Sequence, residues 1–395
     1  MFYLKLRPAA ALLCLMTFSS ALAQDVPASS ERGAGIDPSG DLLSISRQTL
    51  QIFQQRGITF HGQFVHDWSK DLDAGHDSAY GFGRYSFDLS ATFDSEKSLG
   101  WQGGTGFIRL KQHIDEFGWS DDAAAQIYSN IDAASRTTLY EMWFEQKWMA
   151  GKVRIKGGKI DANTEFATVE NAVDFLNSSM GFSPTILTFP TYPEPKPGAV
   201  VSLTEPRGYG ISLGTFQNAM GTMSFAEPRR HWSIGDRELP GHFSAGYWRL
   251  DGAMTCYDGT SSSVSQGFYT VMEQGLWRSK SGDRDQTVST FVQFARTSGT
   301  VSPFTQHLGG GAVWQAPLAS RPHDGLGFAA TWAKFSPQPA AGFDYEGELV
   351  AEGYYKLALL RYISLVPDVQ FLHHPAGLRT NPDVAVFTPR LVISF

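Results

Sequence analysis

Charged and aromatic side chains recur in this sequence at the spacing of one face of a β-strand. Seven of them form sets two residues apart: Arg109 and Lys111; Glu141, Trp143 and Glu145; Arg154 and Lys156. Because successive strand residues point to opposite faces, each set shares a face. Opposed positive and negative groups across a narrow, water-filled passage would create a field that orients polar solutes. The chemistry predicted is recognition, without bond breakage.

A second group of polar side chains lies between residues 161 and 197, where no alternation is sustained. Its candidates are Asp161, Asn163, Glu165, Asn177, Ser178 and Ser179. They offer the carboxylate, amide and hydroxyl partners that sugar hydroxyls require. An irregular stretch of over about 30 residues in a compact fold is usually functional or disordered, so we expect it to fold inward and constrict a lumen. Trp143 is the candidate platform for the apolar face of a sugar; the alternative is a filler residue in the wall.

Lys159 is out of phase with Arg154 and Lys156. We expect a β-bulge at Gly157-Gly158 to turn Lys159 and Asp161 toward the same lumen. The alternative for all these charges is a solvated sheet face without selectivity.

Strands are the elements that must position these residues. From Arg84 to Phe93, apolar residues at odd positions alternate with polar residues, and the closing residues from Phe387 to Phe395 do the same. Tyr140, Met142, Phe144 and Trp148 likewise alternate with Glu141, Glu145 and Lys147. These runs are about ten residues long, the length of a membrane-spanning strand.

Length and composition predict an all-β fold. The chain has 395 residues with 40 Gly and 13% aromatic residues, which suits many strands and turns better than helices. Residues 58–395 provide a transmembrane antiparallel β-barrel of about 16 strands, wide enough to hold an aqueous channel. Before it, residues 24–57 read as a periplasmic linker with a short helix from Asp41 to Gln55.

The N-terminus predicts export. Residues 1–23 combine basic residues, a short apolar core and Ala21-Leu22-Ala23, the pattern of a cleaved signal peptide. The acidic formal charge of −7 argues against nucleic acid as a partner. Cys256 is the one cysteine after the signal, so no intrachain disulfide is expected.

Two regions resemble a known family. In the middle of the chain the motifs are Gly157-Gly158-Lys159-Ile160-Asp161-Ala162-Asn163, Glu165-Phe166-Ala167, Asp174-Phe175-Leu176-Asn177-Ser178-Ser179 and Phe189-Pro190-Thr191-Tyr192-Pro193. Near the end they are Glu352-Gly353-Tyr354-Tyr355-Lys356, Pro367-Asp368-Val369-Gln370-Phe371 and His374-Pro375. Their order resembles the carbohydrate-selective porins of the outer-membrane porin B type, over about residues 58–395. The terminal Phe395 is similar to the assembly signal of bacterial outer-membrane barrels.

The resemblance implies a 16-stranded barrel in the outer membrane of a Gram-negative bacterium. It implies passive diffusion of monosaccharides such as glucose, with a lumen-facing belt of charged and aromatic residues. The expected partners are mono- and small oligosaccharides and outer-membrane lipid. The assembly is left open between a monomer and a homotrimer, and neither a cofactor nor a metal is expected.

Three other functions are weighed on the same residues. A non-selective general porin would use the same barrel, and a secreted or periplasmic sugar-binding protein would use the same sugar contacts. An outer-membrane barrel enzyme has little support: Gly210-Ile211-Ser212-Leu213-Gly214 matches a nucleophile elbow, but the flanking residues continue a strand where the motif needs a helix. His373-His374 lacks a second ligand pair at the spacing of a zinc site.

Overall fold

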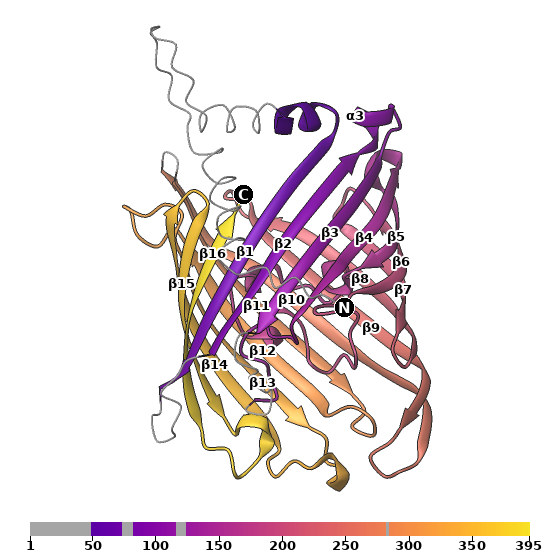
Figure 1. The fold of residues 1–395 in the computed structure, drawn as a ribbon, viewed down its shortest axis with the longest axis vertical. Coiled ribbons are helices and arrows are strands. Elements are labelled where there is room, and N and C mark those ends of the chain that lie inside the picture. The colour runs from indigo at the N-terminus through magenta and orange to yellow at the C-terminus, as the bar shows by residue number, and fades with distance from the viewer. Residues whose placement is uncertain (1–48, 73–81, 116–123, 282–283) are drawn as a thin grey trace, which may run out of the picture.

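Sixteen antiparallel strands close into a barrel in the computed structural model, in which each strand pairs with its neighbours in sequence and β1 pairs with β16 (Figure 1). The structure describes residues 49–72, 82–115, 124–281 and 284–395. The first eight strands are β1 Ile58–Asp71, β2 Phe82–Asp94, β3 Gly104–Asp115, β4 Arg136–Trp148, β5 Val153–Ile160, β6 Lys196–Thr204, β7 Tyr209–Asn218 and β8 Gly221–Ile234. The others are β9 Leu239–Thr255, β10 Ser261–Ser281, β11 Arg284–Thr297, β12 Phe304–Gln315, β13 Gly325–Phe335, β14 Gly347–Leu360, β15 Ile363–His373 and β16 Val384–Ser394. The predicted all-β barrel is confirmed.

Helices are short and lie between the strands. They are α3 Ser95–Leu99, η3 Met149–Gly151, η4 Ala162–Thr164, η5 Glu170–Ala172, α4 Ser178–Gly181, η6 Pro339–Ala341 and η7 Pro375–Gly377. Residues 49–55 are also helical, which agrees with the end of the predicted helix. The rest of that helix, the signal peptide and most of the linker lie outside the described residues. Among the described residues, no helix has the length and apolar character to span a membrane.

The barrel closes through its last residue. Gly62 and Phe395 exchange two backbone hydrogen bonds, with N–O distances of 2.7 and 2.9 Å. The Phe395 ring covers Gly62 so closely that a Cβ on Gly62 would lie 2.2 Å from it. A side chain at position 62 would therefore require the Phe395 ring at this seam to shift.

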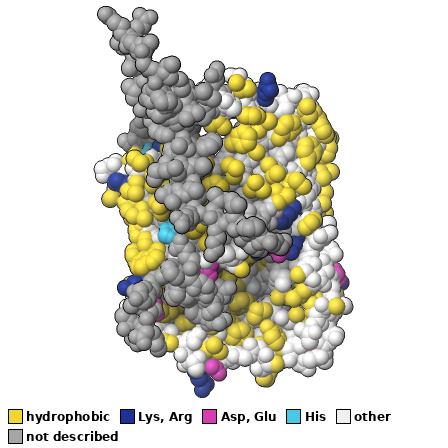
Figure 2. Space-filling model, in the orientation of Figure 1, with side chains coloured by type: hydrophobic (Ala, Val, Ile, Leu, Met, Phe, Trp, Pro, Cys, Tyr) yellow, Lys and Arg dark blue, Asp and Glu magenta, His cyan; other side chains and the backbone are white. Residues whose placement is uncertain are grey.

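The alternation sorts side chains between two environments. Outward positions such as Leu89, Ile108 and Phe144 are exposed and apolar, and Figure 2 shows hydrophobic side chains over much of the visible strand surface. Inward positions carry polar groups that are buried inside the barrel, including Arg84 and Glu141. Closing the sheet leaves no unpaired strand edge, and this arrangement satisfies the backbone within a lipid bilayer.

Tyr140 corrects the predicted alternation of β4. The pairing of β3 with β4 shifts between Arg109 and Leu110, which pair with Glu141 and Leu139 respectively, so Tyr140 is the extra residue of a β-bulge. Its side chain is 2% exposed and lies on the lumen side with Glu141, whereas the prediction placed it outward. A bulge puts two successive residues on one face, which a strict period of two does not anticipate.

The chain between β5 and β6 folds into the barrel, as expected. Phe166, Phe175, Leu176 and Met180 are at most 1% exposed and pack in two clusters against inward residues of the wall, such as Phe216 and Phe291. We call residues 161–195 the inner segment. Part of the chain between β3 and β4 is hydrogen-bonded to the inner segment. The Asn130 N–H donates to the Leu176 carbonyl, and the Ser178 N–H donates to the Ile127 carbonyl.

Candidate functional site

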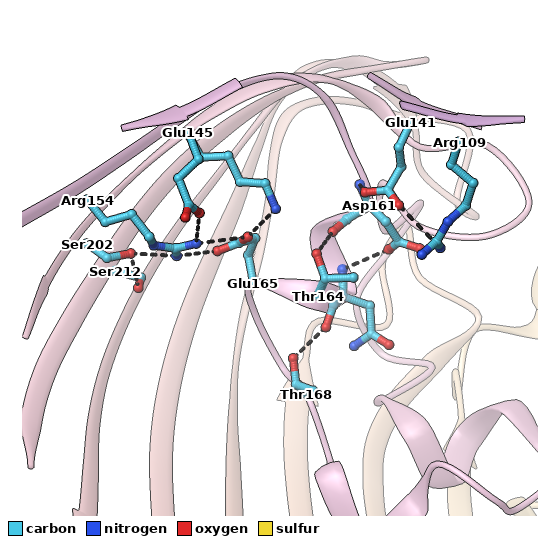
Figure 3. A network of polar contacts seen from close by, with 12 residues as sticks. Arg109, Glu141, Glu145, Arg154, Asp161, Thr164, Glu165, Thr168, Ser202 and Ser212 are labelled. Carbon is cyan, nitrogen blue, oxygen red and sulfur yellow. Dashed lines mark hydrogen bonds and ion pairs between the residues drawn. The ribbon is translucent and has the colours of Figure 1, made fainter. Parts of the chain in front are cut away.

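A carboxylate of the inner segment, Glu165, is held by two cations of β5 (Figure 3). Lys156 Nζ lies 2.8 Å from Glu165 Oε1, and Arg154 contacts both Glu165 oxygens. Arg154 Nη1 also donates to Glu145 of β4 at 2.9 Å, and Nη2 donates to Ser202 of β6 at 2.9 Å. The predicted residues Glu145, Arg154, Lys156 and Glu165 thus meet in one network, which ties the inner segment to three strands.

The contacts with Arg154 and Lys156 lower the pKa of Glu165. Burial alone would raise the pKa of this carboxyl, but the hydrogen bonds and positive charges of Arg154 and Lys156 hold the pKa below its ordinary value. The carboxylate is therefore charged at neutral pH and keeps both cations in place.

A second group forms around Glu141. Its Oε2 lies 3.3 Å from Arg109 Nη1, and its Oε1 accepts the backbone N–H of Asp161 at 3.2 Å. Asp161 in turn accepts the hydroxyl of Tyr140 at 2.6 Å and the backbone N–H of Asn163 at 3.0 Å. Asp161 therefore begins the inner segment as its first anchor, with Arg109 beside it (Figure 3).

Lys111 lies among aromatic rings. Its Nζ is 4.7 Å from the ring centroid of Tyr140 and 4.8 Å from that of Tyr192, and 3.4 Å from Asp88 Oδ2. Tyr192 comes from the inner segment and donates to the carbonyl oxygen of Ile131 at 2.7 Å. Arg109 and Lys111 are adjacent inward residues of β3, as the sequence predicted.

Trp143 is on the lumen side, between Glu141 and Glu145 in sequence. Its ring stacks on Phe107 with centroids 4.9 Å apart, and Lys156 Nζ lies 3.8 Å from its centroid. The ring thus orients Lys156 by a cation–π contact. Its indole N–H is buried and donates to no described group.

Four predicted polar residues lie within the inner segment: Asn163, Asn177, Ser178 and Ser179. Asn163 donates to the carbonyl oxygens of Phe166 and Ala167. Asn177 is 1% exposed, caps α4 by accepting from Ser179 N, and donates to Gln370 of β15. Ser178 donates to the Ile127 carbonyl and Ser179 is 3% exposed. The expectation that these groups line the lumen is corrected for Asn177 and Ser179, which are buried. Asn163 and Ser178 are half-buried, and their side chains donate to backbone carbonyls.

The prediction that Lys159 faces the lumen is also wrong. Gly157, Gly158 and Lys159 pair one-to-one with residues of both β4 and β6, so the expected bulge is absent. Lys159 pairs with Met142, a 52% exposed residue of the outer face. Its ammonium group donates to the Leu139 carbonyl and lies away from Arg154 and Lys156. Asp161 still reaches the lumen side, because it follows the end of β5.

The sequence prediction missed a set of wall glutamates that bind the inward chain through its backbone. Glu227 of β8 accepts from Ala167 N at 2.9 Å, and Glu273 of β10 accepts from Glu170 N and Asn171 N at 3.1 and 2.7 Å. On β14, Glu352 accepts from Leu176 N and Asn177 N, and Glu348 from Ala125 N and Gln126 N. Each glutamate is at most 4% exposed. These four residues are called the wall glutamates below.

Ser212, the serine of the elbow-like motif, lies within β7, where its hydroxyl contacts Ser202 and accepts from Arg229 Nη2. Within residues 49–72, 82–115, 124–281 and 284–395, no three His, Cys, Asp or Glu side chains are grouped to hold a metal ion.

Comparison with known proteins gives the family. The model of the carbohydrate-selective porin OprB family matches residues 83–395. No curated protein matches the sequence. Among solved structures, Pseudomonas putida OprB at high pH is similar with a TM-score of 0.78 and 16% identity, over 89% of this chain and 96% of that one. Its low-pH structure has a TM-score of 0.57 and 19% identity, over 93% and 100%.

A loop-deletion form of OmpT from Vibrio cholerae shares the fold with a TM-score of 0.54 and 10% identity, over 86% of this chain and 99% of that one. At these identities the structures establish the barrel fold, whereas the family model covers most of the sequence, including β3 to β5, the inner segment and the closing strand β16. The chain belongs to the carbohydrate-selective porin OprB family, and it is a transport channel of the Gram-negative outer membrane.

Proposed function

We propose that this porin passes monosaccharides, glucose among them, and that the inner segment with its charged belt sets the selectivity. The belt consists of Arg109, Lys111, Glu141, Glu145, Arg154, Lys156, Asp161 and Glu165. The observation that carries the proposal is the anchoring of Glu165 to Arg154 and Lys156, which fixes an inward chain against the wall. A fixed constriction lined by charge and aromatic rings can discriminate solutes by hydrogen bonding as well as by size.

The outer face supports the membrane part of this proposal. Leu213, Met272 and Phe328 are among its exposed apolar side chains, and Trp148 and Trp277 lie near strand ends. Such a surface suits contact with outer-membrane lipid, with the tryptophans at the interfaces. The proposal requires neither a cofactor nor a metal.

Swelling of proteoliposomes tests selectivity for sugars. Vesicles containing the detergent-refolded protein are diluted into isotonic glucose or into isotonic serine, which is smaller and uncharged overall. A sugar-selective channel should admit glucose at least as fast as serine. A general porin would admit solutes in the order of their size, with serine faster than glucose, and vesicles without protein provide the baseline.

A further inference from the structure

Arg109 differs from Arg154 and Lys156 in how much of its side chain remains accessible to a solute. Arg154 is bound by Glu145, Glu165 and Ser202, and Lys156 by Glu165 and the Trp143 ring. In the described part of the chain, the guanidinium group of Arg109 has a single ionic partner, Glu141, reached through Nη1 at 3.3 Å. Its side chain is 33% exposed, against 20% for Arg154 and 7% for Lys156.

The two carboxylates beside Arg109 are buried and hydrogen-bonded. The Glu141 side chain is 3% exposed and is held from behind by the backbone N–H of Asp161. Asp161 is itself occupied by the Tyr140 hydroxyl and the Asn163 N–H. A donor of the inner segment thus binds Glu141 of the wall, and a donor of the wall, Tyr140, binds Asp161 of the inner segment. The Arg109 side chain is more exposed than either acid.

Lys111 adds a second positive charge on the same face of β3. Its side chain is 14% exposed, and the rings of Tyr140 and Tyr192 hold its ammonium group. Asp88, 3.4 Å away, is its one ionic partner among the described residues. A guanidinium group offers five N–H donors in a plane that fits a carboxylate, and an ammonium group beside it adds a further donor.

We propose that Arg109 and Lys111 form a binding site for the carboxylate of a sugar acid, such as a hexuronate, within the channel. This rests on the proposed passage of sugars and adds a substrate class to it. A singly charged carboxylate suits the site better than a phosphate dianion, because the carboxylates of Glu141 and Asp88 already lie 3.3 and 3.4 Å from the two cations.

Block of ion current in a planar bilayer tests the proposal with glucuronate and glucose, which share the pyranose ring. For the unmodified protein at pH 7, the half-blocking concentration of glucuronate should be about tenfold lower than that of glucose, since one charge-assisted hydrogen bond provides that much. Arg109→Gln, and separately Lys111→Gln, should bring the ratio toward one. Arg249→Gln is the matched control, because Arg249 pairs with Asp251 and both are exposed.

The outcomes separate this inference from the proposed function. If glucose blocked the current and the half-blocking concentration of glucuronate were no lower, the sugar-acid site would be overturned and the sugar channel would stand. Absence of block by either solute would remove both proposals. If acetate blocked at the same concentration as glucuronate, a general anion site would replace the one proposed. Retention of the tenfold ratio in both Arg109→Gln and Lys111→Gln would also overturn the assignment.

Discussion

The carboxylate of Glu165 bridges two cations that are two residues apart on one strand, with Oε1 2.8 Å from Lys156 Nζ and 3.2 Å from Arg154 Nη1. Glu165 lies on the chain that enters the barrel, and the cations lie on its wall. The contact therefore joins the inner segment to the wall of the barrel.

Glu165→Gln should destabilise the protein at neutral pH. Removing one partner of a buried ion pair typically costs about 3–5 kcal/mol, and the amide would leave Lys156 without a counter-charge at this position. Thermal unfolding in detergent, followed by the loss of heat-modifiable gel mobility, measures the difference. Glu346→Gln is the control, because Glu346 pairs with Lys334 while its own side chain is 73% exposed.

The same variant should reveal a pH dependence. The pKa of Glu165 is lowered from an ordinary value of 4.5, so its ion pairs stabilise the folded state above pH 4.5 and lose that effect as pH falls through the folded pKa. The difference in Tm between the unmodified protein and Glu165→Gln should be present at pH 7 and shrink below pH 4.5. A difference that grew on acidification would contradict the assigned contacts.

Glu273→Gln should loosen the inner segment. The carboxylate accepts two backbone N–H groups and the Asn171 amide, and an amide side chain has a single acceptor oxygen. Each buried N–H that loses its acceptor costs about 1–3 kcal/mol. Single-channel recording should show a higher or more variable conductance, with weaker preference for glucose over serine in swelling assays. Unchanged conductance and selectivity would show that Glu273 does not position the segment.

Trp143→Ala should weaken the block of ion current by sugar while leaving an open channel. The substitution removes the ring that contacts Lys156 at 3.8 Å and packs on Phe107. Trp143→Phe keeps an aromatic face and should retain part of the block. If sugar blocked the current through the alanine variant as well as it blocks the unmodified protein, Trp143 would be a wall residue without a role in recognition.

Gly62→Val should impair closure of the barrel. A Cβ at position 62 would lie 2.2 Å from the Phe395 ring, and overpacking of this kind typically costs about 1–3 kcal/mol. Gly157→Val is the control, since a Cβ on Gly157 meets no atom within 4 Å. The yield of heat-modifiable, folded protein after refolding should fall for the first variant and remain near normal for the second.

The sequence predicted the barrel because its signal is local. The alternation of residues 84–93 and the length of the runs are properties of single strands, and the structure confirms them. The placement of Arg154 and Lys156 on one inward face follows from the same period. The lack of alternation between residues 161 and 197 predicts the entry of this stretch into the barrel, and the structure shows it for residues 161–195.

Features that depend on two strands at once were not predictable in this way. The bulge that turns Tyr140 inward is a property of the β3–β4 register, and the absence of a bulge at Gly157-Gly158 is a property of β5 with both neighbours. The wall glutamates bind backbone groups far away in sequence, as Glu273 and Asn171 do. Their positions in strands gave no indication of these partners, because a backbone N–H has no sequence signature.

The current through single channels of the mature protein in a planar bilayer, recorded as glucose is added, tests the central claim most directly. If the inner segment and its charged belt form a sugar-selective constriction, glucose should reduce the current in a saturable manner. A current that falls only in proportion to the viscosity of the glucose solution, without saturation, would contradict a sugar site in the channel.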